Sequence, residues 1–359
     1  MQQTTPQPAR HPNPTAKAVK LAHLVFTRPD LDKCETYLRD FGMTIVEKTE
    51  DLLLARSADS SPYCYRVHRA PSAGFVGLAF LVDSRAELEA LAKLPGASPI
   101  ATAEFAGGGE QTVLKDPSGF TVEVIWGQQK VEPLTFRTPM TMNWGGEHPR
   151  VNGTQRPPHD PPQALRLGHV VLDFAEYQTT AAWYTEHFGL IPSDVQLLPD
   201  GSPLVAFLRL DLGDAPADHH TVAMAQGLWP AYNHSAYEVT DADAVGVGMR
   251  VLRERGYRHA WGIGRHILGS QIFDYWDDPW GDTHEHYCDG DVFTANVPTG
   301  YHSARMDGLF QWGPELPVSF VKPKLSPHTA RLAIHHLRNT PDVTFGKIRS
   351  MARVMARTR

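Results

Sequence analysis

Short apolar runs and amphipathic segments follow one another along the chain in an order that occurs twice. In the first half, an apolar run at 19–26 precedes a segment with helical spacing, Asp30–Phe41, which stops at Gly42. A second helix is predicted over Ser84–Leu94. Further strand-like runs lie at Leu52–Ala55, Val76–Val82 and Thr121–Trp126.

The second half repeats this order with longer insertions. A strand-like run at Leu165–Asp173 precedes a helical segment, Glu176–Phe188, which again ends in Phe-Gly. A second helix is predicted from Asp241 to Arg255. The strand-like runs of this half are Leu204–Leu210, His220–Ala225, His234–Val239, Ser270–Trp276 and Thr283–Cys288.

Two landmarks align between the halves. Leu-Ala-His-Leu-Val-Phe around His23 matches Leu-Gly-His-Val-Val-Leu around His169. Lys-Asp-Pro-Ser-Gly-Phe-Thr-Val-Glu, ending at Glu123, matches Asp-Asp-Pro-Trp-Gly-Asp-Thr-His-Glu, ending at Glu285. The offsets are 146 and 162 residues, so the second copy carries 16 more residues between the landmarks. We therefore predict an α+β fold of two tandem modules, each made of paired βαβββ units.

These patterns divide the chain into a disordered leader (1–18), a first module (19–130), a proline-rich linker (131–164), a second module (165–295) and a C-terminal extension (296–359). The extension becomes basic, with a helical pattern, from Pro327. We expect this tail to be a solvated helix or a disordered end. A helix that covers the mouth of an active site or a subunit interface is the alternative.

The composition is that of a soluble globular protein, with 42% apolar and 21% charged residues. A net charge of −6 gives no reason to expect a nucleic acid partner. The three cysteines show neither a disulfide framework nor paired zinc-ligand spacing. No apolar stretch approaches the ~20 residues that span a bilayer, and the N-terminus lacks the apolar core of a signal peptide. We therefore expect a cytoplasmic protein that does not bind membranes.

Polar residues recur inside the apolar runs of the second half, where an unpartnered imidazole would cost about 1–3 kcal/mol. They are His169, His220, His234, His266, Tyr275 and Glu285. Each alone is more often an ordinary core or surface residue. Together they include the two histidines and one carboxylate that can hold non-haem iron on one face, with positions left open for substrate and O2. The others suit proton handling beside the metal.

The joint spacing of these residues resembles that of the type I extradiol ring-cleavage dioxygenases of the vicinal oxygen chelate superfamily, over residues 20–295. The resemblance implies the paired βαβββ fold of that superfamily. It also implies the Fe(2+) ligands His169, His234 and Glu285, and the catalytic residues His220, His266 and Tyr275. In His-His-Thr-Val-Ala-Met the resemblance favours His220 over His219. The stretch that ends in Thr-His-Glu-His is richer in aromatic and histidine residues than the family's commoner Asp-Pro-Ser-Gly form.

The first module resembles the inactive copy of the same family. His23 and Glu123 persist there, but the position that matches His234 is Gly77, in Phe-Val-Gly-Leu-Ala-Phe. Two ligands without the third make a poor metal site. We therefore expect one metal site, in the second module, and a core role for His23.

These assignments predict an enzyme of aromatic catabolism that uses Fe(2+) and O2 to open a catechol-type diol beside its two hydroxyls. His220 would donate the proton that triggers cleavage, and Tyr275 would hold the substrate hydroxyl that loses its proton, with His266 either supporting Tyr275 or contacting the substrate. One alternative is a 2-oxo-acid-dependent oxygenase resembling hydroxyphenylpyruvate dioxygenase. Another is a non-catalytic small-molecule-binding member of the superfamily. A homo-oligomer is usual for the family. The sequence does not decide whether the diol is monocyclic or biaryl, nor whether the metal is iron or manganese.

Overall fold

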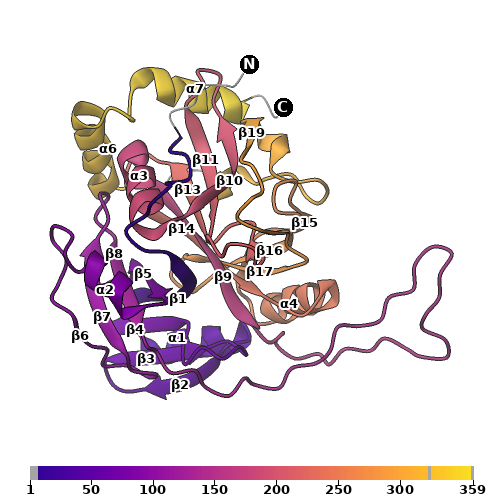
Figure 1. Cartoon of the computed structure of the whole chain (residues 1–359). Coiled ribbons are helices and arrows are strands. Elements are labelled where there is room, and N and C mark those ends of the chain that lie inside the picture. Colours follow the sequence, from indigo (N-terminus) through magenta and orange to yellow (C-terminus); the bar gives the residue numbers. More distant parts are fainter. Residues whose placement is uncertain (1–6, 322–324, 357–359) are drawn as a thin grey trace.

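The computed structural model describes residues 7–321 and 325–356, and its two β-sheet modules pack against each other (Figure 1). Each module contains two βαβββ units in sequence order, the third unit with one extra two-residue strand. The predicted α+β fold of tandem paired units is therefore confirmed.

The first module is an eight-stranded mixed sheet with two helices. In spatial order its strands are β2 (Thr44–Lys48), β3 (Leu52–Arg56), β4 (Tyr65–Arg69), β1 (Ala18–Arg28), β5 (Gly74–Val82), β8 (Thr121–Trp126), β7 (Glu110–Lys115) and β6 (Ala101–Thr102). The helices are α1 (Leu31–Asp40) and α2 (Arg85–Leu91). The side chain of Asp30 caps the start of α1, and Gly42, with φ +97°, follows its end because left-handed backbone favours glycine.

The second module is a nine-stranded sheet, again with two helices in its βαβββ units. In spatial order its strands are β15 (Arg258–Arg265), β16 (Ile272–Asp277), β17 (Thr283–Cys288), β14 (Ala231–Glu238), β9 (Arg166–Phe174), β13 (Val222–Gln226), β11 (Pro203–Arg209), β10 (Ile191–Leu197) and β19 (Gly300–Ser303). The helices are α3 (Tyr177–Phe188) and α4 (Ala242–Glu254), and a small ribbon pairs β12 (Ala217–Asp218) with β18 (Val292–Phe293).

A single hydrophobic core continues from one module into the other. Phe26 of β1 and Tyr232 of β14 meet with ring centroids 5.3 Å apart. Beside them, the fully buried guanidinium of Arg28 lies 2.9 Å from a carboxylate oxygen of Asp278 and 2.9 Å from one of Asp282. A buried charge is tolerated only with such partners, so this ion pair favours one fixed arrangement of the modules.

Residues 7–17 lie against the second module, and the prediction of a disordered leader is wrong for them; residues 1–6 lie outside the described residues. The backbone N–H of Thr15 donates to the carbonyl of Glu186 in α3 (2.8 Å). Arg10 and Lys17 pair with Asp211 at 2.7 and 2.9 Å. Local composition did not reveal this segment's order because its partners come from distant parts of the chain.

Between the modules the chain makes a long excursion away from the body of the molecule (Figure 1). No helix, and no strand longer than a single β-bridge, lies between the end of β8 and the start of β9. Arg137 pairs with Asp241, the N-cap of α4, at 2.7 Å, and the backbones of Trp144 and Glu147 form a bridge farther along. The boundaries of the linker and of the other predicted segments stay predictions.

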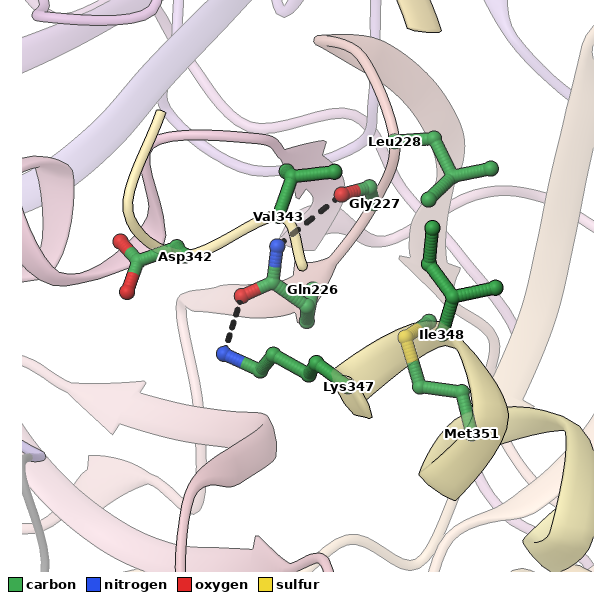
Figure 2. Close-up of a pocket in the computed structure, with 8 residues that line it drawn as sticks. All are labelled: Gln226, Gly227, Leu228, Asp342, Val343, Lys347, Ile348 and Met351. Carbon is green, nitrogen blue, oxygen red and sulfur yellow. Dashed lines mark hydrogen bonds between the residues drawn. The ribbon is translucent and has the colours of Figure 1, made fainter. Parts of the chain in front are cut away.

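The basic tail forms two helices rather than one: the first has no buried residue, as expected of a solvated helix, and the second packs on the second module. The extension contains α5 (Val318–Val321), α6 (Pro327–Asn339) and α7 (Phe345–Ala356). The buried Lys347 donates from Nζ to Oε1 of Gln226 on β13 (2.6 Å), as Figure 2 shows. Val354 packs in a small cluster with Leu198 and Ala304. None of the helices in the described ranges is long and apolar enough to cross a membrane.

Candidate metal centre and active site

Three polar side chains converge on one face of the second sheet. His169 lies on β9, His234 on β14 and Glu285 on β17, and these strands are neighbours in the sheet. Ala236 of β14 pairs in register with both His169 and Glu285. Because side chains alternate between the faces of a sheet, this register directs the three residues to one side. One potential ligand atom from each lies within 4.8 Å of the others.

This cluster is buried, and its carboxylate lacks hydrogen bonds. Oε2 of Glu285 lies 3.2 Å from Nε2 of His169 and 3.5 Å from Nε2 of His234. Among the described residues, neither carboxylate oxygen has a hydrogen-bond partner. Burial raises the pKa of Glu285 to about 8 and lowers the pKa of His169 to about 3. A divalent cation would satisfy the carboxylate and requires neutral imidazoles, so the donor set fits such an ion.

Asn233 fixes the orientation of one of these imidazoles. Its side-chain oxygen lies 2.8 Å from Nδ1 of His234 and accepts the proton there, which leaves the lone pair of Nε2 directed at Glu285. The amide of Asn233 in turn donates to Asp173 (3.3 Å). The residue pattern along the chain did not single out Asn233. The available signal was its place beside a ligand candidate on the same strand.

His266 and Tyr275 form a hydrogen-bonded pair beside the cluster. Nδ1 of His266 lies 2.7 Å from the carbonyl of Leu309, which can only accept, so this nitrogen carries the proton. Nε2 of His266 then accepts from the hydroxyl of Tyr275 (2.9 Å) and lies 4.0 Å from Oε1 of Glu285. Tyr275 pairs in register with Glu285, which places both side chains on the same face of the sheet.

His220 approaches the cluster from the segment before β13, which begins at Val222 rather than at His220 as predicted. Its imidazole packs against that of His169 with ring centroids 4.0 Å apart. The neighbouring His219 turns away and hydrogen-bonds to Asp194 at 2.7 Å. The structure therefore places His220 closer to the candidate ligands than His219.

Aromatic side chains cover the cluster. Trp261, Phe273 and Tyr275 form a buried group on β15 and β16, and Phe320 of α5 packs on it. The ring of Phe320 lies 5.0 Å from that of Tyr275 and 6.2 Å from that of His234. The segment over the site is therefore the one that contains α5, whereas α7 of the basic tail packs on β13.

The opposite face of β17 contacts the first module. His286 donates from Nε2 to the carbonyl of Phe41 (2.8 Å), and the two rings stack with centroids 3.9 Å apart. Nε2 of His284 lies within hydrogen-bonding distance of the hydroxyl of Tyr65 (3.2 Å). Glu285 lies between these two histidines in sequence, so the strand that presents the carboxylate is held from behind by the other module.

Strand register supports the alignment of the two modules at the ligand positions. Gly77 of β5 pairs with Val25 of β1, as His234 of β14 pairs with Val171 of β9, and each pair joins corresponding strands. A Cβ atom at Gly77 would lie 1.9 Å from the carbonyl oxygen of Thr121. The first module therefore has no room for a third ligand without movement of its backbone.

A guanidinium occupies the place beside Glu123 where the second module would hold a cation. Arg66 binds both oxygens of Glu123, and Nε2 of His23 lies 3.1 Å from Oε2. Burial alone would raise the pKa of Glu123, but the hydrogen bonds and charges of His23 and Arg66 lower it to about 2. His23 is thus a partnered core residue in the structure.

Replacing Arg66 with methionine is expected to destabilise the protein by about 3–5 kcal/mol, because it leaves a buried carboxylate without its counter-charge. Chemical denaturation followed by circular dichroism would measure the change. The matched control is Arg69→Met, since Arg69 lies on the same strand with a side chain 46% exposed and should change stability by under about 0.5 kcal/mol. Equal effects of the two substitutions would contradict this account of Glu123.

A sheet of paired βαβββ units with two histidines and a glutamate on one face is the arrangement of a metal-dependent enzyme of the vicinal oxygen chelate superfamily. Over 327 residues the chain is 31% identical to metapyrocatechase 2 of Cupriavidus necator, covering 89% of this chain and 96% of that protein. The chain belongs to the extradiol ring-cleavage dioxygenases of that superfamily, as its residue pattern predicted. No protein-family model matches the chain.

Solved structures show the same fold at lower identity. The Mn(II)-bound glyoxalase from Novosphingobium aromaticivorans has a TM-score of 0.72 and 21% identity, over 87% of this chain and 97% of that one. Homoprotocatechuate 2,3-dioxygenase from Arthrobacter globiformis has a TM-score of 0.68 and 21% identity, over 88% and 94%. Members of this fold therefore include both a glyoxalase and a ring-cleaving dioxygenase.

Proposed function

We propose that this dioxygenase cleaves a catechol-type aromatic diol with O2 at a mononuclear non-haem Fe(II) held by His169, His234 and Glu285. The observation that carries the proposal is the fully buried carboxylate of Glu285, without a hydrogen bond, beside two imidazoles. One carboxylate and a divalent ion leave a net charge of +1, which attracts a diol that has lost a proton. Three protein ligands on one face leave room for both the diol and O2.

The bound iron would supply the electron exchange between diol and O2 that organic side chains cannot provide. Tyr275 would orient the substrate hydroxyl that loses its proton, because its own proton is already directed at Nε2 of His266. Burial lowers the pKa of His266, so its imidazole is neutral and can accept that hydrogen bond. His220, packed on His169, would donate a proton as the ring bond breaks.

The aromatic cover would keep bulk water from the reacting groups. Phe320 and Trp261 pack with ring centroids 5.5 Å apart, and the indole N–H of Trp261 donates to the carbonyl of Pro314 (2.9 Å). That bond directs the polar edge of the indole toward the covering segment. Exclusion of water strengthens each charge interaction inside the site.

Anaerobic purification with Fe(II), followed by a spectral screen of diols under air, tests the proposal. Catechol, alkylcatechols, 2,3-dihydroxybiphenyl and trihydroxybenzenes cover monocyclic and biaryl substrates. We expect a yellow ring-opened product from at least one diol and one iron per chain by elemental analysis. Reconstitution with Mn(II) in parallel identifies the active metal. Turnover of a 2-oxo acid with release of CO2, and of no diol, would contradict the proposal.

A further inference from the structure

A line of hydrogen bonds leads from the molecular surface to His220. His302 on β19, with its side chain 43% exposed, places Nε2 at 2.6 Å from Oδ1 of Asp194 on β10. The other carboxylate oxygen, Oδ2, lies 2.7 Å from Nε2 of the buried His219. Nδ1 of His219 lies 3.0 Å from Nδ1 of His220. Three contacts therefore connect solvent to the imidazole that packs on His169.

The direction of the first two bonds is fixed by the carboxylate. Burial alone would raise the pKa of Asp194, but its hydrogen bonds to His219 and His302 outweigh burial and lower it. An ionised carboxylate can only accept hydrogen bonds. Both His302 and His219 therefore donate to it from Nε2.

The contact between the two adjacent histidines then couples their proton positions. When His219 is neutral, its proton is on Nε2, so its Nδ1 accepts and His220 must carry its own proton on Nδ1. When His219 is doubly protonated, its Nδ1 donates instead, and the proton of His220 moves to Nε2. Nε2 of His220, which does not contact His219, is thus a proton acceptor in the first state and a proton donor in the second.

The surroundings hold this relay in place. The ring of Phe207 packs on His219 and His220 with centroid distances of 5.4 and 5.0 Å. A Cβ atom at Gly300 would lie 2.0 Å from Oδ1 of Asp194, so only glycine lets β19 approach that carboxylate. The backbone N–H of His219 donates to the carbonyl of Asp291 (2.9 Å).

We propose that Asp194 and His219 are positioning residues that set which nitrogen of His220 carries its proton, and that His302 connects this relay to solvent. The inference rests on the proposed function, because it assigns His220 to the ring-cleavage reaction. Asp194 and His219 touch neither substrate nor metal in this account. They act through His220 alone.

The test is a double-mutant cycle between Asp194→Asn and His220→Phe, with kcat, KM and iron content measured for the diol that the wild-type enzyme turns over best. Alone, Asp194→Asn should lower kcat by about 10–100-fold, a part of the 10²–10⁴ that a general acid typically contributes, while KM and iron content stay within about twofold. In the His220→Phe background the same substitution should have no further effect on kcat. A general loss of structure would instead lower both backgrounds alike.

Two further variants separate the relay from simple destabilisation. Gly300→Ala displaces the carboxylate of Asp194 without changing an ionisable group, and should lower kcat in the wild-type background only. His302→Ala should lower kcat by less than about tenfold, since Asp194 keeps its bond to His219. His159→Ala is its matched control, because His159 is also 43% exposed and bonded through Nε2 to a carboxylate, that of Glu254, and should leave kcat unchanged.

The failure of this inference is distinguishable from failure of the proposed function. A wild-type enzyme that binds no iron and cleaves no diol overturns the proposed function. The relay alone is overturned if the wild-type enzyme binds iron and cleaves a diol, but Asp194→Asn leaves kcat unchanged. It is also overturned if Asp194→Asn lowers kcat equally with and without His220.

Discussion

The His234→Ala and Glu285→Gln variants are expected to purify without stoichiometric iron and to lose ring cleavage. His234 supplies one of only two imidazoles in the cluster, and Glu285 supplies its only carboxylate. Metal catalysis stabilises the transition state by several kcal/mol. Because each ~1.4 kcal/mol is a tenfold change in rate, we expect turnover to fall by at least on the order of 10³. Elemental analysis and the formation rate of the yellow product measure the two effects.

The first module supplies the matched control for the ligand variants. Glu123 occupies the position in β8 that corresponds to Glu285 in β17, and both pair with an alanine of the preceding strand in the sheet, Ala79 and Ala236. Glu123→Gln removes a carboxylate of the same local structure and should leave iron content at one per chain. Loss of iron in Glu123→Gln, with retention in Glu285→Gln, would reverse the assignment of the two modules.

His220→Phe is expected to retain iron and substrate while kcat falls by about 10²–10⁴, the range of a general acid. The phenyl ring can keep the packing on His169, where the centroids are now 4.0 Å apart, but it carries no proton. KM, iron content and the thermal unfolding midpoint should change little. Steady-state kinetics together with elemental analysis provide the measurement.

The control for this substitution is His68→Phe in the first module. His68 is half-buried on β4 of the first module's sheet, whereas the metal cluster lies on the second, and its ring packs on that of Phe105 with centroids 6.0 Å apart. Its replacement should leave kcat unchanged. If His220→Phe fails to retain iron, His220 is a ligand or supports one, and the assignment to proton transfer is wrong.

The elements that the sequence predicted well are those with a clear apolar periodicity. The run Leu165–Asp173 was recovered as β9 within a residue at each end, and so was the helix capped by Asp241. β10 was missed because Ile191–Leu197 contains a proline and three polar residues. Two of those, Ser193 and Gln196, are buried, so burial in this strand does not follow the apolar pattern.

The same limit decides which parts of the site could be predicted. His169 and His234 were visible because they interrupt strand-like runs, and Glu285 because its stretch aligns with the one that ends at Glu123. The structure brings the three together. Asp194 was invisible because it lies on the missed strand, and its importance depends on pairing with a histidine 25 positions away. Phe320 covers the site from the part of the extension before Pro327, whose residues carry no periodic signal. Contacts of this kind are set by tertiary packing and cannot be inferred from local pattern.

The two faces of β17 explain why a chain whose described residues form one candidate metal site keeps two modules. After a duplication, a copy without chemistry is free to drift or to be deleted unless selection acts on it for another reason. Here the first module supplies the carbonyl of Phe41, which accepts a hydrogen bond from His286, and the hydroxyl of Tyr65, which lies within hydrogen-bonding distance of His284. These two histidines flank Glu285 in the sequence. The present role of the first module is thus to support the strand of the second module that carries Glu285. A single-module version of this enzyme would therefore need a newly designed backing for that strand before it could inherit the activity.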